Sequence, residues 1–456
     1  MDALLDYVLL HFYSLYGSPS RPFDIHYGLN GTSSVQISRS DLSFFESNDP
    51  FPEKVRWEEW GGRQIPFFFP TPEEGPLLRI RDGQAIITQD VISSAFYLLS
   101  GWQEFHSPSR DRFHRFPYEA SVQYRHQFIT VPVVNYYFDL LKEAIEQAQG
   151  ITLSSRLWGG APFATCVTHD VDRYESAWKI ASQEELRRGN VKAASRLLWQ
   201  KLQGRDAWSN LPEVMGVLEK YGAEATFFFL PNHAKHQGHP NADYDISTPR
   251  YQKLLAEVER RGHEVGVHGS FKTATHAGYL LQEAARLQRP VQGNRFHYLC
   301  YDPSVTADVL KESGLKYDST LGFPEHFGFR NGYCLPFWPF DFKNRRPYPF
   351  LEIPLHLMDV TLHHPHYLQV PPAEMFGAVK PMLEEIIKFR GCFTLLWHNE
   401  NFSDHAFPGG RAVFEEIISY AASQKTVFLT GSQVWAELEK GTGGKGTLKT
   451  KPHPWV

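Results

Sequence analysis

The sequence predicts an α/β protein in which a (β/α) barrel follows a smaller α+β domain. From about Gly160 onward, strand-like and helix-like segments alternate about seven or eight times, which is the pattern of parallel strands joined by helical crossovers. Two segments, Phe227–Leu230 and Phe393–Trp397, are continuous apolar runs, as expected for strands covered on both faces. An open, doubly wound sheet is the alternative fold, but no glycine-rich phosphate-binding turn follows the first strand.

Each barrel strand is expected where a short apolar or β-branched run is bounded by glycine or polar residues. These runs predict strands at 163–168, 224–230, 263–267, 293–299, 316–321, 352–360, 392–398 and 427–430. Helices show an apolar period and often a closing glycine; Pro212 suits a first helical turn and Gly222 a helix end. These features predict helices at 211–221, 250–261, 279–287, 305–313, 373–389 and 412–423.

Two domains are expected because 456 residues exceed one ordinary core. Residues 1–155 lack the alternation and predict a separate α+β domain of unknown function. Its expected elements are strands at 65–69 and 84–88, a helix capped by Asp90 and running to about residue 105, and a helix at 134–149. The segment 111–118 is charged and rich in aromatic residues. For the domain as a whole, a scaffold or dimer surface is expected more than a second active site. The barrel is expected over 160–440, and the glycine-rich residues 441–456 predict a flexible tail.

Composition excludes several classes of protein. The formal net charge of −5 gives no sign of a nucleic-acid partner. The four cysteines show no paired spacing and predict buried or edge thiols rather than disulfides or a zinc knuckle. No apolar run approaches the roughly 20 residues that a membrane span requires. The first ten residues carry acids where a signal peptide needs positive charge, so we expect a cytoplasmic protein.

Polar residues gather where the expected strands end. Asp170 and Asp172 follow the first strand, and their i, i+2 spacing places both on one side of an extended chain. Two acids there are costly to desolvate, so they hold a metal, share a proton or pair with a cation. His268, Arg295 and His398 lie on three other strands. Such a set, at the face where barrel enzymes build their sites, suits metal-assisted or acid–base hydrolysis.

Four of these segments resemble the motifs of the polysaccharide deacetylase family (NodB homology, carbohydrate esterase family 4). Thr168-His-Asp-Val-Asp172 is similar to its Thr-Phe-Asp-Asp-Gly motif. Gly262-His-Glu-Val-Gly-Val-His268 is similar to the second motif with its lead, and Arg295-Phe-His-Tyr298 to Arg-x-Pro-Tyr. Thr394-Leu-Leu-Trp-His398 resembles the last motif, an apolar strand ending in a catalytic histidine. The first domain looks like the uncharacterised domain that precedes a variant group with a His-Asp-Val-Asp motif.

The resemblance implies a deformed (β/α) barrel of the polysaccharide deacetylase type and a role for each matching residue. Asp170 would be the general base, and Arg295 would pair with it. His268 would bind a metal, and His398 would be the general acid toward the leaving amine. The backbone N–H of Tyr298 would help to bind the oxyanion.

Two departures from the family pattern affect the metal site. The family's second acid, a metal ligand, aligns with Val171, so Asp172 is the candidate replacement. The family's second metal-binding histidine falls at Lys272, whose charge opposes a cation. His297 stands where the motif has proline and offers a nitrogen instead. We therefore expect Asp172, His268 and His297 to hold one divalent metal ion, zinc being the first candidate, with a coordination position left open.

The expected function is a hydrolase that removes an N-acyl group, in the first instance N-acetyl, from a carbohydrate by metal-assisted attack of water. One alternative is a metal-independent C–N hydrolase acting on a small cyclic amide, which the lysine at 272 would favour. Another is a non-catalytic carbohydrate-binding relative. For single residues, structural roles stay open: Asp170 and Asp172 could form a network with Arg173, and His297 could be a hydrogen-bonded core histidine.

Overall fold

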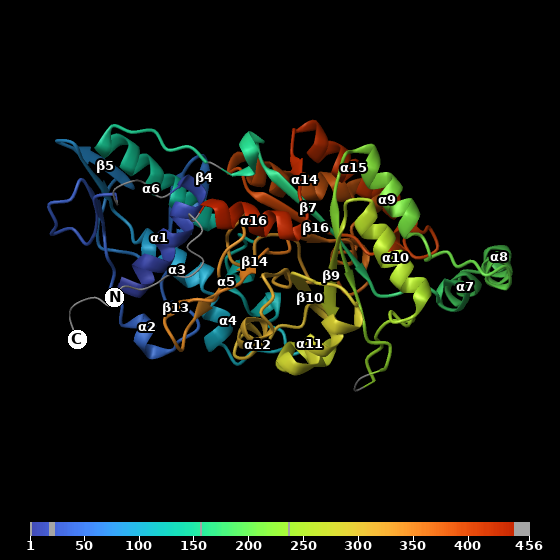
Figure 1. Cartoon of the computed structure of the whole chain (residues 1–456). Coiled ribbons are helices and arrows are strands. Elements are labelled where there is room, and N and C mark those ends of the chain that lie inside the picture. Colours follow the sequence, from blue (N-terminus) through green and yellow to red (C-terminus); the bar gives the residue numbers. More distant parts are fainter. Residues whose placement is uncertain (1, 18–22, 156, 236–237, 442–456) are drawn as a thin grey trace.

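The computed structural model describes residues 2–17, 23–155, 157–235 and 238–441 (Figure 1). Its second domain is built on a nine-stranded sheet whose strand order is β14-β11-β10-β9-β8-β7-β16-β15, with β17 pairing with the start of β7. All pairings in this sheet are parallel. The strands are β7 (Ala164–Val171), β8 (Ala225–Phe229), β9 (Glu264–Gly269), β10 (Gly293–Phe296), β11 (Tyr317–Asp318), β14 (Leu351–Glu352), β15 (Leu357–Met358), β16 (Cys392–Leu396) and β17 (Val427–Phe428).

The sheet curls into a deformed barrel, which confirms the predicted fold class. Its two edge strands, β14 and β15, are consecutive in the chain and are joined by residues 353–356 alone. The path of paired strands does not close between them among the described residues. One continuous strand was expected over 352–360. It is interrupted at Pro354, which has no N–H to give to a sheet ladder.

The crossover helices begin and end close to the expected positions. The α9 helix carries Pro212 in its first turn, and α12 ends at Gly314 in the left-handed conformation. Three helices were not expected. These are α7 and α8, which lie between β7 and α9, and α16 at the end of the described chain. The helices are α7 (Ala177–Arg187), α8 (Val191–Leu202), α9 (Leu211–Lys220), α10 (Pro249–Arg260), α11 (Ala277–Arg286), α12 (Thr306–Ser313), α13 (Asp359–His363), α14 (Pro372–Lys388), α15 (Gly410–Ser423) and α16 (Gly431–Gly441).

The N-terminal domain is of α+β type, as expected. A four-stranded sheet, in the order β1-β2-β6-β5, and the β3–β4 hairpin pack with the helices α1, α3 and α6 (Figure 1). The Asp90 carboxylate accepts a hydrogen bond from the Ser93 N–H and caps α3. The elements are α1 (Asp2–Tyr16), β1 (Ile25–Tyr27), β2 (Val35–Ile37), α2 (Phe44–Ser47), β3 (Arg56–Trp60), β4 (Arg63–Phe67), β5 (Leu78–Arg81), β6 (Gln84–Ile87), α3 (Val91–Leu99), α4 (Trp102–His106), α5 (Val122–Arg125) and α6 (Val133–Gln149).

The single helix that was expected from Asp90 to about residue 105 is divided into two helices, α3 and α4. It breaks after Leu99, where Gly101 takes a left-handed conformation (φ 71°), and α4 starts at Trp102. The four cysteines are buried and free, as their spacing predicted. The expected flexible tail falls on residues 442–456, outside the described residues, except that Gly441 ends α16.

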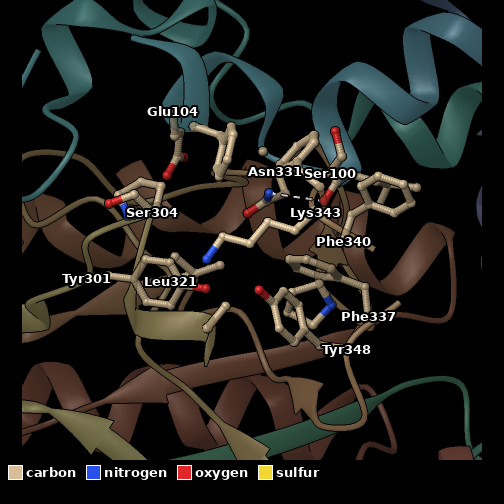
Figure 2. A pocket seen from close by; sticks show the side chains of 17 residues that line it. Ser100, Glu104, Tyr301, Ser304, Leu321, Asn331, Phe337, Phe340, Lys343 and Tyr348 are labelled. Carbon is tan, nitrogen blue, oxygen red and sulfur yellow. Dashed lines mark hydrogen bonds between the residues drawn. The ribbon is translucent and has the colours of Figure 1, made fainter. Parts of the chain in front are cut away.

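The two domains share a continuous buried core. Phe138 of the N-terminal domain packs against Tyr333 of the barrel, and both belong to one apolar cluster. The buried Arg330 guanidinium donates to both carboxylate oxygens of Glu104, at 2.8 and 2.6 Å. A small cavity of about 40 Å³ lies at this interface, and side chains of both domains line it (Figure 2). It includes none of the residues expected to act in catalysis. Of the described helices, none has the length and apolar character needed to cross a bilayer.

Candidate functional site

Strand β7 carries the first acid, Asp170, into contact with Arg295 of β10. The strand runs on to Val171, past its expected end, so Asp170 lies within it and Asp172 directly after it. Arg295 Nη1 lies 3.0 Å from Asp170 Oδ1 and 2.7 Å from Thr168 Oγ1. The remaining guanidinium N–H groups donate to the Ser319 carbonyl oxygen at 2.7 Å and its hydroxyl at 2.9 Å. Arg295 is fully buried, so the ion pair is held in one geometry and shielded from solvent.

Asp172 meets two imidazole rings on the same side. Its Oδ1 lies 3.2 Å from His268 Nε2 and 3.4 Å from His297 Nδ1, and those two nitrogens are 3.1 Å apart. His268 donates its other ring N–H to the Arg295 carbonyl oxygen at 2.8 Å, which turns Nε2 toward the cluster. Asp172 Oδ1 is buried and has no conventional hydrogen-bond donor among the described atoms. One carboxylate oxygen and two imidazole nitrogens, all within 4.8 Å of one another, fit a divalent cation such as zinc.

The neighbouring charges in this cluster favour the ionised forms of Asp172 and His268. Burial opposes ionisation of Asp172, yet the adjacent His297 and His268 hold its pKa well below the usual value. Burial alone would lower the pKa of His268, but Asp170 and Asp172 raise it. Lys272 does not join the cluster: it lies in the short 3-10 helix Phe271–Thr275, with its ammonium 4.5 Å from the Tyr279 ring centroid.

His398 follows β16 and is held by Asp359, which is not among the expected site residues. His398 Nδ1 donates to Asp359 Oδ1 at 2.8 Å, and the His398 backbone N–H donates to Oδ2 at 2.6 Å. Asn401 gives Oδ2 a further hydrogen bond at 2.8 Å. His398 Nε2 faces Asp172, 3.8 Å from its Oδ2. Burial lowers the pKa of His398, but Asp359, Asp172 and Asp170 outweigh burial and raise it to about 10.

A signal for Asp359 was present in the sequence. Asp359 sits near the end of an expected strand, where the other site residues also sit. It directly follows β15, which pairs with β16, the strand before His398. The sequence does not indicate that these two strands pair, and it therefore does not predict the contact between Asp359 and His398.

Tyr298 adopts an uncommon backbone conformation at the edge of the site. The expected strand 293–299 ends at Phe296, and both Tyr298 (φ 60°) and Leu299 (φ 54°) are left-handed, which costs a non-glycine residue about 1 kcal/mol or more. The N-terminal domain holds this turn. Arg115 Nη1 donates to the Tyr298 carbonyl oxygen at 2.6 Å, and Phe113 stacks on the Tyr298 ring at 4.9 Å. The segment 111–118 of the N-terminal domain therefore contacts the turn that follows His297.

Two family models match the chain. Residues 206–297 match the model described as Polysaccharide deacetylase, and residues 13–150 match a family of unknown function, DUF7033. The barrel domain is thus of a class of hydrolases that act on carbon–nitrogen bonds other than peptide bonds. The two matches confirm both resemblances drawn from the sequence, to polysaccharide deacetylases over residues 206–297 of the barrel and to an uncharacterised N-terminal domain over residues 13–150. No curated protein matches the chain.

Several solved structures align with the chain at low similarity. A Mycobacterium smegmatis protein assigned as a polysaccharide deacetylase is 19% identical over 65% of this chain and 96% of its own, with a TM-score of 0.41. Puue allantoinase is 14% identical over 66% and 94%, with a TM-score of 0.38. A pseudoenzyme of carbohydrate esterase family 4 from Bacillus anthracis is 11% identical over 60% and 66%, with a TM-score of 0.30.

Proposed function

We propose that the protein is a metal-dependent hydrolase that removes an N-acyl group, in the first instance N-acetyl, from a carbohydrate. The observation that carries this proposal is the convergence of three arrangements at one end of the sheet. These are the Asp170–Arg295 ion pair, the cluster of Asp172, His268 and His297, and the His398–Asp359 pair. Together they offer a base, a metal-binding set and an acid, which are the functions that amide hydrolysis requires.

Each group then has one task. A divalent ion in the Asp172–His268–His297 cluster would polarise water and the amide carbonyl. Asp170 takes the proton of the attacking water, and Arg295 orients its carboxylate. The tetrahedral oxyanion is bound in part by the Tyr298 N–H. His398, kept protonated beside Asp359, gives its proton to the departing amine.

The direct test is acetate release from a panel of N-acetyl sugars, free and linked to nucleotides or lipids, with and without a chelator. Activity that is lost on chelation and restored by zinc supports the proposal. Activity that survives strong chelation would instead indicate a metal-independent C–N hydrolase. Carbohydrate binding without any released product would indicate a non-catalytic relative.

We expect purified protein to contain about one divalent ion per chain, and His297→Ala to contain clearly less. The reason is that His297 supplies one of the three converging donor atoms. Elemental analysis measures the content. His276→Ala removes an exposed histidine outside the cluster and should leave the metal content unchanged. An active enzyme free of metal would contradict the assignment.

Arg115→Ala should lower kcat by about ten- to a hundredfold, with KM little changed, because the Tyr298 N–H would no longer be held where the oxyanion forms. Hydrogen exchange over residues 296–300 should become faster. Arg110→Ala is the matched control, because Arg110 donates to the carbonyl oxygens of Ser107, Ser109 and Glu104 within the N-terminal domain. Equal kinetics and exchange in the two variants would show that Arg115 has no positioning role.

A further inference from the structure

A helical hairpin projects from the barrel between β7 and α9. It consists of α7 and α8 and lies at the end of the molecule opposite the N-terminal domain (Figure 1). The turn contains Gly189 in the left-handed conformation (φ 78°), and Asn190 caps α8 by accepting a hydrogen bond from the Ala193 N–H. None of the expected barrel strands or helices falls on this stretch of the chain.

The hairpin exposes an apolar surface that nothing in the described chain covers. Its inward residues Ala181 and Leu197 already pack in a small core with Trp208. Five large apolar side chains nevertheless face solvent, and they are Leu186 (51% exposed), Val191 (65%), Leu198 (45%), Trp199 (61%) and Leu202 (81%). Thirteen large apolar residues are exposed in the described chain, so this concentration within 17 residues marks a binding surface rather than scattered exposure.

The same hairpin is strongly basic. Residues 177–202 contain six lysines and arginines and two glutamates, a formal charge of +4 in a chain whose net charge is −5. On α8, Val191, Leu198 and Leu202 fall on one helix face at spacings of seven and four, with Trp199 beside them and Lys192 and Lys201 at the flanks. An apolar face with tryptophan, bordered by basic residues, is the pattern of helices that lie in the interface of an anionic membrane.

The base of the hairpin is hydrogen-bonded to residues that neighbour the proposed site in sequence. Residues 173–176 join Asp172 to α7. Asp206 closes the base of the hairpin by accepting hydrogen bonds from the Ala177 and Trp208 N–H groups, at 3.2 and 3.0 Å. Asn399, the residue after His398, donates to the Arg173 and Trp208 carbonyl oxygens at 3.0 and 2.9 Å. A surface that binds the hairpin is therefore mechanically connected to the site.

We propose that the α7–α8 hairpin docks the enzyme on the surface of an anionic lipid bilayer. Its apolar face enters the interface and its basic residues contact the headgroups. If the proposed deacetylase activity holds, the substrate class that this arrangement favours is a carbohydrate linked to a membrane lipid.

Flotation of the full-length protein with phosphatidylcholine vesicles, with and without phosphatidylglycerol, tests the docking. We expect binding that requires phosphatidylglycerol and weakens in high salt. The double variant Trp199→Ser and Leu202→Ser should lose at least about tenfold in affinity, because two apolar side chains no longer enter the interface. The matched control, Trp57→Ser with Ile80→Ser, removes apolar residues of 40% and 42% exposure from the N-terminal domain and should bind as the wild type does.

Other outcomes overturn the proposal. If the wild-type protein does not bind vesicles, or if the hairpin variant floats with vesicles as well as the wild type does, the hairpin does not anchor the protein to membranes. If light scattering shows a dimer that only the hairpin variant dissociates, without vesicle binding, the surface holds a second copy instead. On a water-soluble N-acetyl sugar the variant should match the wild type, and on a lipid-linked sugar in vesicles it should be slower. Vesicle binding without any deacetylation would refute the proposed function and leave the docking intact.

Discussion

Replacing Asp170 with asparagine should lower kcat by about two to four orders of magnitude while the protein stays folded. The amide cannot take a proton from water at neutral pH. Its oxygen can still accept the hydrogen bond that Arg295 Nη1 gives at 3.0 Å, so the buried guanidinium keeps a partner. Turnover of an N-acetyl sugar measures the loss, and circular dichroism with thermal unfolding checks the fold.

The control for this variant is Asp318→Asn. Asp318 is a buried carboxyl on β11, and burial raises its pKa, so a neutral amide there resembles its protonated form. It accepts a hydrogen bond from Asn294 at 2.6 Å and is outside the proposed catalytic set. We expect it to retain activity. Undiminished turnover in Asp170→Asn would rule out Asp170 as the base.

The second large effect concerns the proposed acid, His398, and its partner Asp359. His398→Ala should lower kcat by about two orders of magnitude or more. Asp359→Asn should lower kcat less and should also change its pH dependence. Burial alone depresses the pKa of His398, and the Asp359 carboxylate is the foremost group opposing burial. Without that charge the pKa falls, so the imidazolium is lost at lower pH and the alkaline limb of kcat moves to lower pH.

A double-mutant cycle separates this effect from general damage. If Asp359 acts through His398, adding Asp359→Asn to His398→Ala should cost little further activity. Additive losses would mean that Asp359 contributes independently. An alkaline limb that stays in place in Asp359→Asn would show that Asp359 does not set the protonation of the acid.

The sequence predicted the repeating part of the fold well because its signals are local. Helix α9 with Pro212 and helix α12 with Gly314 were placed to within a residue or two, since caps and apolar period define them. The strand ends were less accurate. Strand β10 stops at Phe296 because Tyr298 and Leu299 turn left-handed, and neither residue type signals that conformation.

The candidate site was predictable where one residue matched a motif and unpredictable where a role depends on long-range contact. Asp170 and Arg295 were paired through the family resemblance, and the structure brings them together at 3.0 Å. The contact of Arg115 with Tyr298 spans 183 positions and two domains. No local sequence feature in either segment indicates the contact between Arg115 and Tyr298. In the same way, no feature near Asp359 indicates its contact with His398.

The shared core between the domains has a consequence for how the chain can be divided. The barrel segment around Arg330 and Tyr333 is buried against the N-terminal domain. Cutting the chain near residue 155 would expose these side chains to water and remove Glu104, the ion-pair partner of the Arg330 guanidinium. We therefore expect the two regions, which match separate family models, to unfold together, and the barrel to be unstable when it is expressed alone.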